Sequence, residues 1–208
     1  MRHESSTVVV LVGELGDGLL AGLAQSPGVS VARARAAGSA AQDADETAAA
    51  RPGWESGALA LRAATRHRSM YVIVPDDPLA EVAAGWRAMW DVPGPGGASG
   101  PAGFERHAAE ALAAWRDKRF ELPDYYLVIA PARGTEAGPD LYLGPLRAVR
   151  PRRVAVAATA DSAAQVSAVA DALKSLEHGP WWPPLDEMID AARHFYAGGL
   201  AETQQILR

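Results

Sequence analysis

Residues 7–13 read TVVVLVG, and the turn GELGDG (13–18) follows directly. A nearly continuous apolar run of this length is typical of a strand covered on both faces of a parallel sheet. Longer segments of helical period separate it from four more short apolar runs, which are VSVARA (29–34), SMYVIVP (69–75), DYYLVIAP (124–131) and RRVAVAA (152–158). This alternation predicts βαβ units around one parallel sheet.

The run at 29–34 differs from the others. Val29 and Val31 alternate with smaller residues before arginines appear, which predicts a partly solvated edge strand. A flavodoxin-like order 2-1-3-4-5 places strand 2 at the edge, whereas 3-2-1-4-5 places the more apolar run 69–75 there. We therefore expect a single three-layer, doubly wound α/β domain over residues 1–208, with a mainly parallel five-stranded sheet. The order 2-1-3-4-5 is favoured over the alternative 3-2-1-4-5.

Apolar residues at three- and four-residue spacing predict helices over 79–90, 104–119, 162–176 and 184–196. Ser162 and Gln165 have the spacing of a capping box. Gly198 and Gly199 are expected to end the last helix. Two segments lack periodicity. We expect residues 36–53 to form a loop or a frayed helix. Residues 93–103 contain only Pro, Gly, Ala and Ser, so we expect a flexible loop there.

The overall composition excludes some partners and some kinds of site, and it indicates where the protein is found. A net charge of −5 argues against a broad nucleic-acid-binding face and gives no reason to expect a membrane partner. The chain has no cysteine, so disulfides and thiolate metal sites are excluded. The polar N-terminus and short first apolar run predict a cytoplasmic protein. Arginine far outnumbers lysine, as in GC-rich genomes, and we expect a bacterial source.

The predicted topology also predicts where a ligand would bind. Open α/β sheets bind ligands beyond the carboxyl ends of their strands, which the favoured order places between strands 1 and 3. There the turn 13–18 would face Asp76 and Asp77, and Glu14, Asp76 and Asp77 together are candidate ligands for Mg²⁺. Thr159 and Asp161 after strand 5, with Arg133 and Thr135 after strand 4, would complete the site.

A second interpretation of these acids stays open and is favoured. Asp76 or Asp77 stands where the cap of the following helix belongs, and acids there interact favourably with the helix dipole. Under this interpretation the acids hold the fold and bind no metal.

The glycine turn does not complete a known phosphate motif. Gly13 and Gly18 have the spacing of a phosphate loop, but Leu19 and Leu20 stand where lysine and Ser/Thr are required. The dinucleotide pattern fails as well. What is left is a tight turn with candidate ligand-binding residues Gly13, Gly16 and Gly18, whose backbone N–H groups suit an anion.

Two classes of function follow. The first is a site for a small-molecule or nucleotide-type ligand at the carboxyl edge, with Mg²⁺-dependent phosphoryl chemistry as the favoured reaction if the protein is an enzyme. The second is a non-catalytic scaffold that contacts a protein partner or a second copy through the region 178–196. Trp181 and Trp182 lie between prolines in HGPWWPP, and an exposed tryptophan there would suit an interface.

Overall fold

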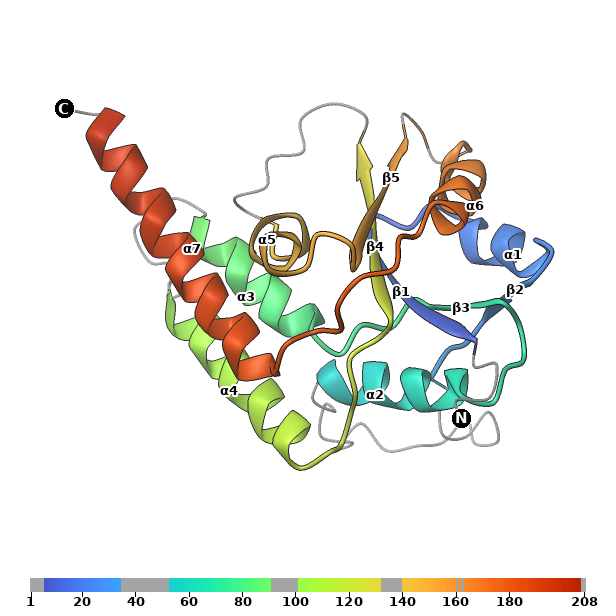
Figure 1. The fold of residues 1–208 in the computed structure, drawn as a ribbon, viewed down its shortest axis with the longest axis horizontal. Helices are drawn as coiled ribbons and strands as arrows, with labels where there is room; N and C mark the ends of the chain where they lie inside the picture. The colour runs from blue at the N-terminus through green and yellow to red at the C-terminus, as the bar shows by residue number, and fades with distance from the viewer. Residues whose placement is uncertain are drawn as a thin grey trace, which may run out of the picture.

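Five parallel strands form one sheet in the computed structural model, which describes residues 6–34, 53–90, 101–131, 140–159, 161 and 163–206. The order across the sheet is β2-β3-β1-β4-β5 (Figure 1). The strands are β1 (Thr7–Gly13), β2 (Val29–Val31), β3 (Tyr71–Val74), β4 (Tyr125–Pro131) and β5 (Val154–Thr159). The predicted fold class, a three-layer parallel α/β sheet, is confirmed, and each predicted apolar run contains or overlaps a strand.

The edge position of β2 is also confirmed, because it pairs with β3 alone. Its neighbour differs from the favoured order, since β3 and not β1 lies beside it, so β1 and β3 exchange places relative to 2-1-3-4-5. Residues 7–10 of β1 pair with β3 on one side, and residues 9–13 pair with β4 on the other. β1 thereby takes the centre of the sheet, where both of its edges and both of its faces are covered.

Successive side chains of β1 enter two different cores. Val9 and Leu11 pack with Leu19 of α1 (Leu19–Ala24) and with α6 (Gln165–Lys174), whereas Val10 and Val12 face the opposite core. The opposite core is covered by α2 (Gly53–Ala64), α3 (Ala80–Trp90), α4 (Pro101–Arg116), the π-helical turn η1 (Tyr142–Leu146) and α7 (Leu185–Ile206). Figure 1 shows α3, α4 and α7 on this face. The short α5 (Arg147–Val149) follows η1 and has no buried residue. The period-two alternation of a strand buried on both faces produces this division.

The larger core is built around Trp86, which is fully buried on α3. Its ring contacts Phe104 of α4 and both Phe195 and Tyr196 of α7, with centroids 5.6–6.3 Å apart. Aromatic pairs at such distances add stabilisation beyond the area they bury. This cluster joins the three helices into one layer.

Three predicted element ends differ from the structure. α7 continues through Gly198 and Gly199 to Ile206, because a glycine in a helix costs only about 1 kcal/mol and does not by itself end it. α4 begins at Pro101, inside the predicted loop 93–103, since proline is well tolerated in the first turn of a helix. The rest of that loop, 93–100, and residues 36–52 lie outside the described residues, and Gly53 begins α2.

Candidate functional site

At the carboxyl edge of the sheet, the connections that follow β1 and β4 leave toward opposite faces. After β1 the chain passes to α1 on one face, whereas after β4 it continues to η1 on the other face. The connection from β1 runs toward the β2 edge of the sheet, whereas the connection from β4 runs toward the β5 edge, so the two connections diverge between β1 and β4. β3, on the other side of β1, also continues to the face opposite α1, so the predicted position between strands 1 and 3 stays a prediction.

The glycine turn that follows β1 is held in a fixed shape. Gly13 has a φ of 113°, and a Cβ there would lie 2.5 Å from the carbonyl oxygen of Ile129 in β4. Gly18 has a φ of 78° and caps the first turn of α1. Both positions require glycine, because other residues are strained at these backbone angles.

Gln165, at the start of α6, braces this turn. Its side-chain Nε2 donates to the carbonyl oxygen of Glu14 at 2.9 Å, and its Oε1 accepts from the Gly16 N–H at 2.8 Å. Gln165 is buried, so both bonds are shielded from water. The Gly16 N–H is therefore used inside the protein and is not available to an anion, contrary to the sequence-based prediction.

The brace also changes how α6 is capped. Gln165 does not complete the predicted capping box; instead the Ala164 N–H donates to Asp161 Oδ1 at 2.8 Å. Thr159 Oγ1 donates to the Asp161 carbonyl oxygen at 2.6 Å, which fixes the turn after β5. Thr159 is buried and Asp161 is exposed, so Asp161 is the residue of this pair that a ligand can reach.

The two acids after β3 bond to different parts of the backbone. Asp77 Oδ1 accepts the Leu79 N–H at 2.9 Å, so its predicted role as the cap of α3 is confirmed. Asp76 Oδ2 accepts the Ala34 N–H at 3.1 Å and holds the chain beyond β2. These bonds separate the two carboxylates instead of directing both into one site.

Asp77 is also part of a buried polar group that sequence reasoning missed. Its second carboxylate oxygen accepts a short hydrogen bond from the hydroxyl of Tyr142 in η1, and Tyr126 of β4 lies beside the pair. Burial raises the pKa of Asp77 to about 6, although hydrogen bonds from Tyr142 and from the Leu79 N–H oppose the rise. Burial and the charge of Asp77 raise the pKa of Tyr142 well above 10. Nothing in the local pattern around Tyr142 indicates this long-range contact.

The structure does not assemble the predicted magnesium site from Glu14, Asp76 and Asp77. Glu14 is exposed, Asp77 is buried against Tyr142, and these residues are absent from the clusters of potential metal ligands in the described part of the chain. The one such cluster there contains Glu81, His107 and Glu110. Arg133 and Thr135 lie outside the described residues.

The two tryptophans of the predicted interaction surface, Trp181 and Trp182, differ in solvent exposure. Trp182 is 5% exposed, donates from Nε1 to the Pro123 carbonyl oxygen at 2.8 Å, and packs against Tyr126. It is a core residue and cannot anchor a partner. Trp181 is 46% exposed, and the guanidinium of Arg153 covers one face of its ring at 4.9 Å.

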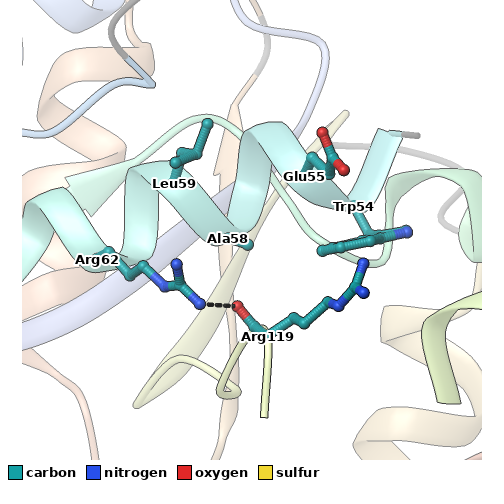
Figure 2. Close-up of a pocket in the computed structure, with 6 residues that line it drawn as sticks. All are labelled: Trp54, Glu55, Ala58, Leu59, Arg62 and Arg119. Carbon is teal, nitrogen blue, oxygen red and sulfur yellow. Dashed lines mark hydrogen bonds between the residues drawn. The ribbon is translucent and has the colours of Figure 1, made fainter. Parts of the chain in front are cut away.

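A separate hollow of about 320 Å³ lies on α2, away from the predicted site residues (Figure 2). The Arg119 side chain runs along the helix, so that its guanidinium reaches Trp54 at 5.7 Å while its carbonyl oxygen accepts from Arg62 Nη2 at 2.7 Å. The remaining lining residues are Glu55, Ala58 and Leu59. No sequence motif had marked this surface.

The chain matches no protein-family model, no curated protein and no solved structure in the three comparisons made. Within the described residues, no helix combines the length and the apolar character needed to cross a membrane.

Proposed function

We propose that this chain binds a small molecule of the nucleotide type at the carboxyl end of its sheet, between β1 and β4. The observation that carries the proposal is the divergence of the two connections, to α1 on one face and to η1 on the other. Open α/β sheets bind ligands at such points. The turn after β1 forms one wall, and its rigidity lowers the entropic cost of binding.

The charge at this edge sets a condition on the ligand. Glu14, Asp17 and Asp161 are all exposed there, and their carboxylates repel a bare phosphate. Mg²⁺ prefers oxygen ligands and is usually held by one or two carboxylates together with substrate phosphates. The proposed binding therefore depends on Mg²⁺, and phosphoryl transfer is the reaction class if catalysis follows.

The test is thermal unfolding with ATP, GTP, AMP or adenosine, each with and without Mg²⁺. A ligand at a hundred times its Kd stabilises the native state by about 2.7 kcal/mol, which appears as a higher melting temperature. We expect a Mg²⁺-dependent rise with at least one nucleotide, reduced in Glu14→Gln. Glu121→Gln, an exposed acid that precedes β4, is the matched control. No rise with any of these compounds would contradict the proposal.

The exposure of Trp181 favours a second candidate, self-association through the amino end of the sheet. Pro180 and Pro183 restrict the backbone on either side, and stacking on Arg153 further orders the indole. Little conformational freedom is then lost on binding. Phe195 and Tyr196 do not extend this surface, because they pack on Trp86.

Analytical ultracentrifugation tests this candidate. Trp181→Ala should lower the fraction of dimer, whereas Leu59→Ala, which truncates an exposed side chain of α2, should leave it unchanged. A wild-type protein that stays monomeric at the highest attainable concentration would eliminate self-association.

A further inference from the structure

The antiparallel packing of α3 on α4 brings three metal-binding side chains together. A Cβ at Gly85 would lie 2.8 Å from Phe104 Cα, so the two helices approach closely at this point. Glu81 lies four residues before Gly85, and His107 lies three residues after Phe104, which places them opposite each other one turn from this contact. Glu110 follows His107 at i+3 and so lies on the same face of α4.

The imidazole of His107 is directed between the two carboxylates. Its Nδ1 lies 3.4 Å from Glu81 Oε2 and 3.7 Å from Glu110 Oε2. All three potential ligand atoms lie within 4.8 Å of one another. The Nδ1 atom is buried and has no hydrogen-bond partner, although buried ring nitrogens normally have one.

The position of Glu81 is restricted from behind. Its carboxyl group lies against Gly53 at the start of α2, where a Cβ would come within 2.6 Å of Glu81 Oε1. The carboxylate therefore has little room to withdraw from His107 toward α2. The close approach at Gly85 and the small residue at Gly53 together hold an acid beside the unpartnered nitrogen.

We propose that Glu81, His107 and Glu110 form a binding site for a zinc-class divalent ion between α3 and α4. One imidazole and two carboxylates suit Zn²⁺ and Co²⁺ better than Mg²⁺, which prefers oxygen ligands alone. Three protein ligands leave the fourth tetrahedral position to water, as in zinc sites that are open to a substrate. This site is independent of the proposed nucleotide site at the carboxyl edge.

Metal binding requires the ring proton to move. Arg106 Nη2 lies 3.2 Å from His107 Nε2 and can only donate, so in the metal-free protein Nε2 accepts and Nδ1 carries the proton. A metal on Nδ1 shifts the remaining ring proton to Nε2, and the exposed Arg106 side chain then has to swing away. The Arg106 cation therefore competes with the metal.

The site is tested by isothermal titration calorimetry, in which Zn²⁺ alone is added to untagged protein. We expect one ion per chain, an affinity at least about tenfold lower in His107→Asn, Glu81→Gln and Glu110→Gln, and an affinity about tenfold higher in Arg106→Gln. Mg²⁺ in excess should not displace Zn²⁺. Co²⁺ should give the absorption bands of a tetrahedral ion, and these bands should disappear in His107→Asn.

His194→Asn is the matched control, because His194 is an exposed helical histidine whose Nδ1 contacts the Asp190 carbonyl oxygen at 2.7 Å. Its Zn²⁺ affinity should equal that of the wild type. Circular dichroism without metal verifies that each variant folds, and Glu110, which is exposed, is the ligand least needed for packing. Equal Zn²⁺ affinity in wild type and Glu110→Gln, or loss of binding in His194→Asn, would overturn the proposal.

Discussion

The two ends of the sheet differ in where their charged side chains lie: those at the amino end are near the surface, and one at the carboxyl end is buried. At the amino end, Arg150, Arg152 and Arg153 donate to backbone carbonyls of the segment 178–181, and their hydrogen bonds lie at or near the surface. At the carboxyl end, Asp77 is buried against a tyrosine hydroxyl and a backbone N–H. An arginine can bond to the protein while its head stays hydrated, whereas Asp77 loses its water. Burial therefore raises the pKa of Asp77 to about 6.

The arginine-rich segment RAVRPRR (147–153) also has a role that its composition does not indicate. A charge run of this kind is ordinarily a solvated turn. Here the Arg153 guanidinium alone donates to the carbonyl oxygens of Pro180, Gly179 and Asp124. These arginines therefore hold residues 178–181 against the amino ends of β4 and β5.

The largest expected effect lies at the amino end. Trp182→Ala should lower the free energy of unfolding by about 3–5 kcal/mol, because it empties a buried site and removes the hydrogen bond to the Pro123 carbonyl oxygen. Urea unfolding monitored by circular dichroism measures the loss. Trp181→Ala is the control and should cost about 1 kcal/mol, chiefly its cation–π contact with Arg153. Similar losses in the two variants would remove the distinction between core and surface tryptophan.

The next effect is a pH dependence at the carboxyl end. Asp77 has a raised pKa in the folded protein, so the folded state binds more protons than the unfolded state between about pH 4 and pH 6. The contribution of Asp77 to stability is complete below that range and falls by about 3 kcal/mol as pH rises through it. Asp77→Asn should abolish this fall, which urea unfolding at pH 4, 5, 6 and 7 measures. Parallel pH profiles for wild type and variant would contradict the prediction.

Tyr142→Phe sharpens the same test. The Tyr142 hydroxyl stabilises the ionised carboxylate and lowers the pKa of Asp77 against the effect of burial. Without that hydroxyl, the fall in stability should extend to higher pH. An unchanged upper limit would show that burial alone sets the titration of Asp77.

The smallest effect concerns Arg153. Arg153→Lys keeps the charge but cannot reproduce three hydrogen bonds from one planar group, so it should cost about 1 kcal/mol at this partly exposed site. Hydrogen exchange should show faster opening in the segment 178–182 and little change around Asp77. Equal acceleration at both ends of the sheet would mean that the two regions do not open independently.

Local pattern was enough to predict the strands, four of the helices and the edge of the sheet. The apolar run 7–13 and its four counterparts identified all five strands. The alternation at Val29 and Val31 identified β2 as the edge strand. A strand buried on both faces is apolar at successive residues, whereas a strand buried on one face is apolar at every second residue. Asp77 could likewise be predicted as a helix cap, since capping involves residues only two or three positions apart.

Tertiary structure alone decided which groups meet. Gln165 is 149 residues from Gly16, and Tyr142 is 65 residues from Asp77, so neither contact leaves a periodic trace in the sequence. The same holds for the placement of β3 beside β2 and for the different exposure of two adjacent tryptophans. Sequence by itself determined the five strands and the helices α3, α4, α6 and α7, because their apolar spacing repeats with the local geometry of the backbone. Which acid loses its water, and which histidine lies between two carboxylates, depended on the packing of distant elements.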